Sequence, residues 1–170
     1  MTSDDIADRY PLPAQLDRDE PLRTGDPVVL PLADGGSVEV GAGVMNAHAQ
    51  EAYAWGHCHA LARALLELAS DRWTLAWFGA RNCWCGRRAR QTCECQVDHV
   101  AVVRDSLVLD ISGLWAVERP GPRAFEAGPV LMTTALWSAI CASPNWVATD
   151  IEPARLFAAT LAKQEPVLLR

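Results

Sequence analysis

The segment GHCHALARALLELAS, residues 56–70, carries the strongest helix signal in the chain. Three leucines recur at the i, i+4, i+7 spacing that puts apolar side chains on one face of an α-helix: Leu61, Leu65 and Leu68. Most of the remaining residues are good helix formers. We therefore expect an amphipathic helix that begins at Cys58 and ends near residue 70.

Strand-forming runs follow this helix and predict an antiparallel sheet beside it. Residues 73–79 form one apolar and aromatic run, and residues 98–113, DHVAVVRDSLVLDISG, form two strands joined by a tight turn. Prolines predict a loop over 117–130. The other expected elements are helices at 134–142 and 151–163 and a hairpin at 28–40 with its turn at 34–36. The predicted fold class is α+β, with a cysteine-bearing helix packed on a small antiparallel sheet.

The chain is predicted to divide into an arm and one domain. It has 170 residues, 50% of them hydrophobic, which is enough for one buried core and excludes disorder over the whole chain. Prolines predict an irregular arm over residues 1–27, followed by a single domain over 28–170. Within that domain, residues 45–55 fit either a helix or a loop.

Charge and hydropathy narrow the compartment and the partners. A net charge of −6 argues against nucleic acid as the main partner. No run approaches the roughly 20 apolar residues of a membrane-spanning helix, and the acidic start MTSDDIADRY does not resemble a secretory signal. We expect a cytoplasmic chain with no membrane partner, or one delivered by a non-classical route. The oligomeric state stays open.

Four of the six cysteines lie in two close Cys-x-Cys pairs and predict a metal loop. Four thiolates form the closed tetrahedral set that structural Zn²⁺ prefers, and a metal would order a loop too short to bury much apolar surface. The expected zinc ligands are Cys83, Cys85, Cys93 and Cys95, in a loop over 83–95 inserted into the domain. The alternatives are disulfides, or unliganded thiols in a loop.

The same loop is locally basic around Trp84. Its cations are Arg81, Arg87, Arg88 and Arg90. Such a patch could grip phosphate and stack a base. One short patch offers few phosphate contacts, however, so we favour a solvated loop tip over a nucleic-acid site.

A cysteine, a histidine and an aspartate follow one another in an order that suits nucleophilic catalysis. Cys58 opens the predicted helix, where the helix dipole and free N–H groups stabilise a thiolate. If Asp105-Ser106 is a two-residue hairpin loop, His99 and Asp110 become diagonal neighbours on one sheet face. A three-residue loop would put them on opposite faces.

Each of these residues also has an ordinary structural interpretation. Cys58 lies three residues before Leu61, on the apolar stripe of the helix, where a buried cysteine is commonly inert. His99 could be a hydrogen-bonded core histidine, and Asp110 could cap a loop. The residues alone leave both interpretations open.

Other reactive or aromatic residues are interpreted as packing. Three tryptophans and one cysteine belong to this group: Trp115, Trp137, Trp146 and Cys141. A His/Cys metal site around Cys58 is conceivable and would use His48, His57 or His59. Adjacent helical residues point in different directions, however, which disfavours a site that uses all of them.

Two motifs resemble the papain-like and transglutaminase-like superfamily of cysteine hydrolases. Residues 56–62, GHCHALA, are similar to the G-x-C-x-A segment around the nucleophile. Residues 98–102, DHVAV, followed by Leu109-Asp110, are similar to the histidine and aspartate strands of that superfamily. The resemblance covers residues 46–113 and suggests a compact bacterial or phage member with a zinc loop inserted.

The resemblance implies roles for these residues. Cys58 would be the thiol nucleophile, His99 the base and Asp110 the residue that orients it. Papain-like enzymes carry an oxyanion-binding glutamine six residues before the cysteine, where this chain has alanine. The nearest amides are Gln50 and Asn46, and either could reach an oxyanion beside the Cys58 N–H.

The sequence therefore predicts a thiol-dependent hydrolase or acyl transferase that acts on an amide bond. Peptidase, deamidase and amidase activities all fit, with a protein or peptide as the expected substrate. The alternative is a non-enzymatic, zinc-stabilised adaptor that binds protein or nucleic acid through the Arg-rich loop. In that alternative Cys58 is buried and inert.

Overall fold

The computed structural model describes residues 27–31, 36–41, 43, 47–54, 56–83, 85, 93–118, 125–143, 146 and 151–169. Apart from Pro27, the predicted arm over 1–27 lies outside these residues. So do Asn46 and most of the predicted turn at 34–36. The division into an arm and one domain therefore stays a prediction.

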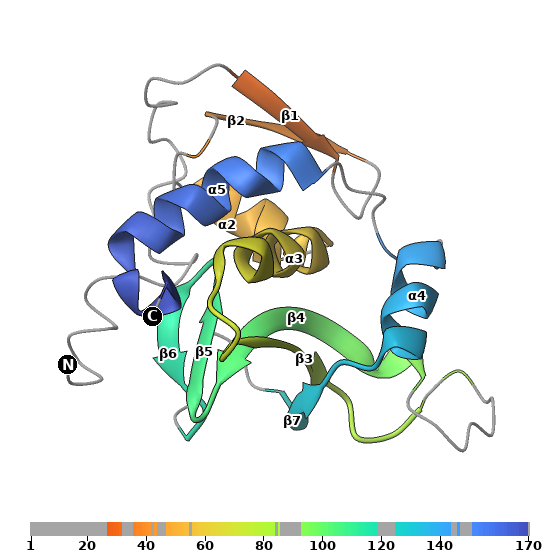
Figure 1. Cartoon of the computed structure of the whole chain (residues 1–170). Helices are drawn as coiled ribbons and strands as arrows, with labels where there is room; N and C mark the ends of the chain where they lie inside the picture. Colours follow the sequence, from red (N-terminus) through yellow and green to blue (C-terminus); the bar gives the residue numbers. More distant parts are fainter. Residues whose placement is uncertain are drawn as a thin grey trace.

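A five-stranded antiparallel sheet forms one layer of the fold (Figure 1). Its strands lie in the order β6-β5-β4-β3-β7. They are β3 (Thr74–Gly79), β4 (Val97–Arg104), β5 (Leu107–Asp110), β6 (Gly113–Ala116) and β7 (Ala127–Leu131). A separate antiparallel hairpin pairs β1 (Pro27–Pro31) with β2 (Ser37–Gly41), which confirms the hairpin predicted over 28–40.

Strand β7 corrects the loop predicted over 117–130. Its residues pair with β3, through Ala76 with Leu131 and Trp77 with Val130. β7 is an edge strand, so one side of it needs no ladder hydrogen bonds, and Pro129 is tolerated there although it lacks an N–H. The prolines were misleading because their cost to a strand depends on its place in the sheet.

The helices lie on one face of the sheet or beside it (Figure 1). They are α2 (Ala47–Ala54), α3 (Cys58–Leu68), α4 (Thr134–Ala142), α5 (Ile151–Gln164), and the 3₁₀ segments η2 (Glu94–Gln96) and η3 (Pro166–Leu169). Helix α3 lies between the sheet and α5, in contact with β4 on one side and α5 on the other. The predicted α+β class, with a cysteine-bearing helix on an antiparallel sheet, is confirmed.

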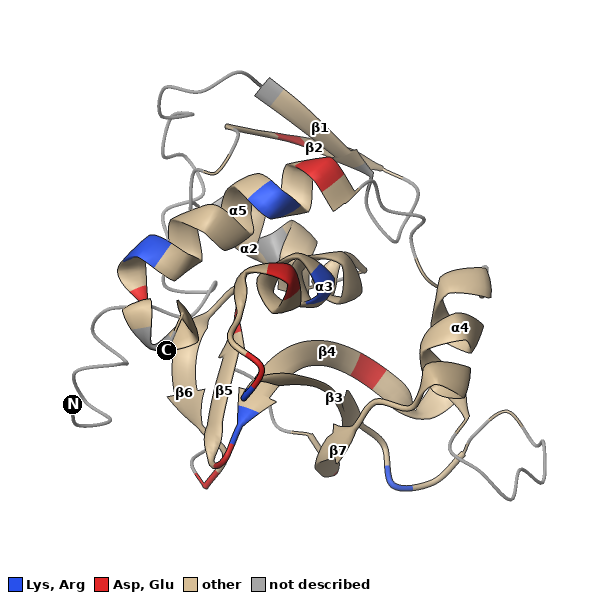
Figure 2. Cartoon of the chain, viewed as in Figure 1, with Lys and Arg blue, Asp and Glu red and all other residues tan. Residues whose placement is uncertain are grey.

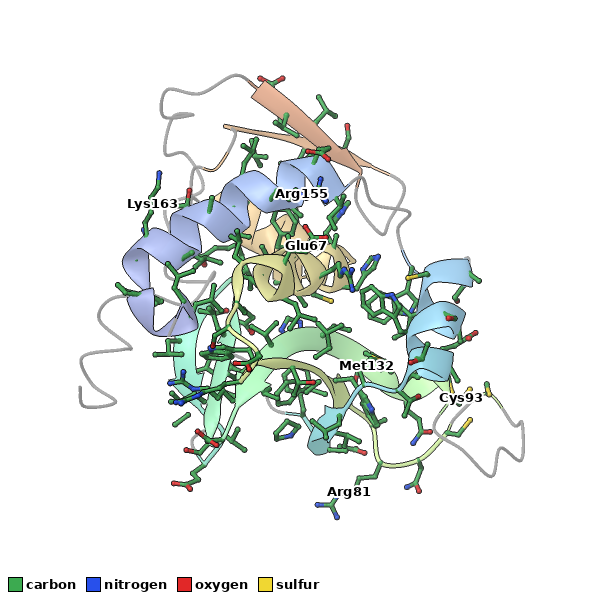
Figure 3. The ribbon with its side chains drawn as sticks, in the orientation of Figure 1. Glu67, Arg81, Cys93, Met132, Arg155 and Lys163 are labelled. Atoms are coloured by element: carbon green, nitrogen blue, oxygen red, sulfur yellow. The ribbon has the colours of Figure 1, made fainter. Side chains whose placement is uncertain are left out.

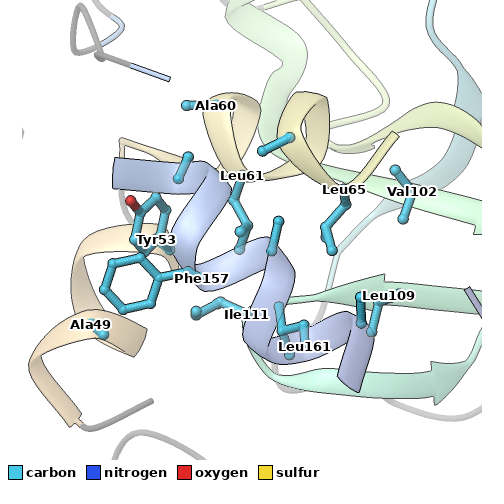
Figure 4. Close-up of a cluster of buried hydrophobic side chains, with 14 of the residues drawn as sticks. Ala49, Tyr53, Ala60, Leu61, Leu65, Val102, Leu109, Ile111, Phe157 and Leu161 are labelled. Carbon is cyan, nitrogen blue, oxygen red and sulfur yellow. The ribbon is translucent and has the colours of Figure 1, made fainter. Parts of the chain in front are cut away.

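Helix α3 is buried on two sides because it packs against both layers (Figure 4). Leu61 and Leu65 are fully buried in a cluster that includes Tyr53 and Phe157. Truncation of either leucine to alanine would cost about 2–5 kcal/mol. Leu68, predicted on the same stripe, is 41% exposed because it ends the helix.

The outer face of α3 is tied to α5 by an exposed ion pair. Arg155 Nε donates to Glu67 Oε2 at 2.9 Å (Figure 3). Such a surface pair adds little stability, so the apolar cluster is the main link between the two helices. None of the helices in the described part of the chain has the length and apolar character needed to cross a membrane.

Candidate functional site

The β4–β5 hairpin has the predicted register. Arg104 pairs with Leu107 and Val103 with Val108, on either side of a two-residue turn. Asp105 takes a left-handed backbone, with φ 54°, which aspartate tolerates better than most residues. This turn length is the one that brings His99 and Asp110 to the same side of the sheet.

His99 and Asp110 form a buried hydrogen-bonded pair. His99 Nε2 lies 2.8 Å from Asp110 Oδ2, and both residues are 3% exposed. The second carboxylate oxygen, Oδ1, accepts a hydrogen bond from the Ser112 backbone N–H at 2.7 Å. Asp110 is thereby held in place, and it in turn fixes the plane of the imidazole.

Aromatic rings fix the other side of that imidazole. The Phe125 ring is stacked on the His99 ring, at 5.8 Å between centroids and 8° between planes. The ring of Phe78, which pairs with His99 across β3 and β4, lies 6.3 Å from the imidazole, between centroids. The sequence analysis missed Phe125 because it lies far along the chain in a segment predicted to be a loop.

Cys58 is the first residue of α3 and is 2% exposed. It lies in an apolar cluster with residues from α3, the sheet and α4, namely Ala62, Trp77, Val97, Val100, Leu136 and Ile140. Gly56, at φ 101°, makes the turn that brings the chain into the helix. A narrow cavity beside the thiol is lined by His99 and Asp110 among others, so the predicted triad residues lie together.

The Cys58 thiol is acidic although it is buried. Burial by itself raises its pKa, but hydrogen bonds and charges from His59 and His99 outweigh burial and lower the pKa from 9.0 to about 6. For His99, burial has the opposite effect and by itself lowers the pKa. Hydrogen bonds and charges of Asp110 and Cys58 outweigh burial and raise the His99 pKa from 6.5 to about 9. Between these values the favoured state is a thiolate beside an imidazolium.

The two ring nitrogens of His99 have separate roles. Nε2 is engaged by Asp110, whereas Nδ1 is buried without a hydrogen-bond partner of ordinary geometry. Besides Asp110, the Cys58 side chain is the polar group that raises the pKa of this ring. We infer that Nδ1 is the ring atom that serves the thiol.

His59 also acts on the thiol, which the sequence analysis did not anticipate. It is 7% exposed, and its ring lies 5.1 Å from Trp146 and 6.3 Å from Trp137, between centroids. Adjacent helical residues were expected to diverge, yet the His59 side chain lowers the pKa of Cys58. The two tryptophans do pack, as predicted, but they pack against the cluster that holds the thiol.

Only one of the two predicted oxyanion donors, Gln50, lies among the described residues. Gln50, on α2, is 4% exposed, and its Oε1 is buried without a hydrogen-bond partner. It does not line the cavity beside Cys58. Asn46 lies outside the described residues, so both roles stay predictions.

The four clustered cysteines converge on one point in the loop between β3 and β4 (Figure 3). Their sulfur atoms all lie within 4.8 Å of one another, and the short contacts are Cys83 to Cys85 at 3.1 Å, Cys83 to Cys95 at 3.2 Å and Cys85 to Cys93 at 3.6 Å. Tetrahedral Zn–S bonds of about 2.3 Å would place sulfurs about 3.8 Å apart, so the set fits a zinc ion. All six cysteines are free thiols in this structure, so none forms the disulfides kept as an alternative.

Two further sequence predictions concern Cys141 and a second metal site around Cys58. Cys141, interpreted as a packed residue, is exposed on α4, so that interpretation was wrong; the residue lies on the outer face of its helix. The described residues contain no second group of at least three side chains placed to hold a metal. The His48 side chain lies outside the described residues, so the conceivable site around Cys58 is not tested.

The basic patch is described only in part. Arg81 contacts the residue directly before β7, because its Nε donates to the Glu126 carbonyl at 2.7 Å. The other predicted members, Arg87, Arg88, Arg90 and Trp84, lie outside the described residues. Elsewhere the described Lys and Arg residues are spread over several helices and strands (Figure 2).

Comparison of the chain with models of known protein families, with curated proteins and with solved structures found no match. The site must therefore be interpreted from its own geometry. That geometry combines an acidic buried thiol, an imidazole held by a carboxylate, and a separate four-thiol cluster suited to a metal.

Proposed function

We propose that this chain is a thiol-dependent hydrolase or acyl transferase that acts on an amide bond, with a papain-like arrangement of Cys58, His99 and Asp110. The observation that carries the proposal is the 2.8 Å bond from His99 Nε2 to Asp110 Oδ2, in a ring that also interacts with the Cys58 thiol. A nucleophile, a base and an orienting group in sequence are the recurring apparatus of acyl transfer.

Near neutral pH the reaction would begin from the ion pair. The Cys58 thiolate attacks the carbonyl carbon of the amide, a C–S bond forms, and negative charge collects on the carbonyl oxygen. The His99 imidazolium then gives its proton to the leaving nitrogen, the C–N bond breaks, and a thioester remains on Cys58.

The second half of the reaction breaks the C–S bond and regenerates the thiolate–imidazolium pair. His99, now neutral, takes a proton from water or from an acceptor amine, which attacks the thioester and releases the acyl group. Throughout, Asp110 holds Nε2 and keeps the ring in place. Water as the acceptor gives hydrolysis and an amine gives acyl transfer.

The oxyanion would need hydrogen-bond donors beside the thiol. The backbone N–H of Cys58 belongs to the first residue of α3, so it has no partner within the helix. Gln50 and Asn46 remain the predicted side-chain donors. His59 would help to keep the thiol ionised in the resting state.

The four-cysteine loop would contribute structure rather than chemistry to this reaction. Zinc held by Cys83, Cys85, Cys93 and Cys95 would have its four positions filled by thiolates, which leaves none for water or substrate. We therefore assign no catalytic step to the metal.

The adaptor alternative expects an inert thiol at Cys58. A buried cysteine without charged neighbours has a raised pKa, whereas two imidazoles lower that of Cys58 to about 6. This difference favours the hydrolase. We propose a protein or peptide as the substrate, because the resemblance to papain-like enzymes points to such amides.

The experiment measures the alkylation rate of Cys58 by iodoacetamide against pH, on zinc-loaded protein with Cys141→Ser to remove the exposed thiol. We expect the rate to rise with a midpoint near pH 6. A midpoint near 9, or no fast thiol, would contradict the ion pair and support the adaptor. Amide and peptide libraries then test turnover, with Cys58→Ala as the inactive control. Turnover that survives Cys58→Ala would refute the mechanism.

A further inference from the structure

The four-cysteine loop leads directly into the strand that carries His99. Cys95 lies in η2, Val97 begins β4, and His99 follows two residues later. Gln96 stands between the metal ligands and the strand. Its position makes it the residue through which order in the loop can reach the candidate active site.

The Gln96 side chain ties together both ends of the loop. Its Oε1 accepts a hydrogen bond from the Cys93 backbone N–H at 3.0 Å, and its Nε2 donates to the Arg81 carbonyl at 3.0 Å and to the Ala80 carbonyl at 3.4 Å. The Gln96 carbonyl in turn accepts from the Ala80 N–H at 2.9 Å. One residue thus joins a ligand-bearing turn to the end of β3.

The same contact sets an irregularity in the strand register. Phe78 pairs with His99, but Gly79 pairs with Val97, so Asp98 is an extra residue in β4. A Cβ at Gly79 would lie 1.9 Å from the Gln96 carbonyl oxygen, so the two strands approach more closely here than any side chain permits. The pairing of β3 with β4 is regular from His99 to Val103, so the bulge lies directly between the loop and His99, the first regularly paired residue of β4.

The loop also supports the wall that covers Cys58. Val97 lies in the apolar cluster of the thiol, and η2 contacts α4, whose Leu136 and Ile140 lie in that cluster as well. The metal loop therefore adjoins the thiol pocket on two sides, through the start of β4 and through α4.

We propose that metal loading of the four-cysteine loop controls the reactivity of Cys58 by fixing the bulge directly before His99, with Gln96 as the positioning residue. With four ligands bound, the Cys93 turn is rigid and Gln96 is held; without metal, a loop with so little apolar surface of its own loses that order. The thiol would then lose part of the imidazole contact that keeps it ionised. This inference builds on the proposed function, but it concerns thiol chemistry that can be measured without any substrate.

The first test compares zinc-loaded and chelator-treated protein, in the Cys141→Ser background. Cys58 alkylation is followed at its own peptide by mass spectrometry, because chelation also frees the loop thiols. We expect removal of zinc to slow alkylation at pH 7 and to move its midpoint above 6. An unchanged Cys58 rate and midpoint in the metal-free protein would overturn the proposal.

The second test separates coupling from metal binding, and it decides the matter even if the metal-free chain unfolds. Gln96→Ala keeps all four ligands, so the variant should still hold about one zinc. We expect alkylation at pH 7 to slow about tenfold, as a rise in the pKa of Cys58 by about two units would produce. The matched control is Glu94→Ala, in the same 3₁₀ turn, whose side chain takes no part in the Gln96 bonds.

The outcomes of this comparison are distinct. If Gln96→Ala binds a full equivalent of zinc and its Cys58 alkylation profile equals that of the Glu94→Ala control, the proposed coupling is overturned. A slowed, upward-shifted profile with zinc retained would support it. If the proposed amide chemistry fails, Cys58 alkylation would still depend on Gln96, so the two failures can be told apart.

Discussion

Cys58 and the four-cysteine cluster place the same side chain in opposite surroundings. Cys58 is the one cysteine among the described residues of its apolar cluster, and two imidazoles beside it lower its pKa to about 6. In the cluster, the thiols contact one another: hydrogen bonds from Cys85 and Cys95 raise the pKa of Cys83 to about 12, while the pKa of Cys95, which burial raises, is lowered to about 7 by the bond to Cys83. At Cys58 the protein itself supplies the positive charge that stabilises a thiolate. In the four-cysteine cluster a bound cation would have to supply it.

The comparison teaches that neighbours decide what a thiol can do. Burial alone would make the Cys58 thiol less acidic, and it becomes more acidic only through His59 and His99. The clustered thiols have no histidine or lysine within the group. They are therefore suited to share a divalent metal, which would neutralise their charge and make them poor nucleophiles.

The largest expected effect is a loss of activity without a loss of zinc. Cys58→Ala should reduce turnover of an amide substrate by about 10⁴-fold or more, because no other cysteine lines the described cavity with His99. Its zinc content, measured by atomic absorption, should stay at that of the parent protein. A joint loss of activity and zinc would mean that the substitution disturbs the four-cysteine loop as well as the thiol.

The next effect tests the carboxylate behind the imidazole. Asp110→Ala should lower kcat by about 10²–10⁴-fold, since the ring loses its orientation and its stabilising charge. Asp110 raises the pKa of His99, so its removal should move the alkaline limit of the pH profile downward from about 9. The surface variant Asp71→Ala should change neither; an unaltered alkaline limit in Asp110→Ala would contradict the assigned role.

The third prediction concerns the cluster. Cys83→Ser should weaken zinc binding by about 10²-fold or more, measured by competition with a chelating dye, because a thiolate ligand is replaced by a weaker one. Cys141→Ser, which changes an exposed cysteine outside both regions, should bind zinc like the parent. Undiminished affinity in Cys83→Ser would exclude this sulfur as a ligand.

The smallest effect sharpens the role of the second imidazole. His59→Gln should raise the pKa of Cys58, because a hydrogen bond and a partial positive charge are lost. A rise of about one unit would slow alkylation at pH 6 about fivefold. A midpoint that stays near 6 would show that His59 only packs between Trp137 and Trp146.

Much of the frame could be predicted because its signals are local. Leucine spacing predicted α3, and alternation with a two-residue turn predicted the β4–β5 hairpin and its register. The pairing of His99 with Asp110 followed from that register alone. The errors lie where distant partners decide, as in β7, whose strand character comes from pairing with β3 despite its proline.

The sequence by itself determined which residues are candidates for the chemistry: a cysteine that opens a helix, a histidine and an aspartate on one hairpin, and four cysteines spaced for a metal. Helical and β periodicities settle such placements within a few residues. Tertiary structure alone decided the state of those groups. Phe125 on the His99 ring, α4 against Cys58 and Gln96 across the loop bring together segments far apart in the chain. The acidity of the thiol depends on those contacts, and no local pattern encodes them.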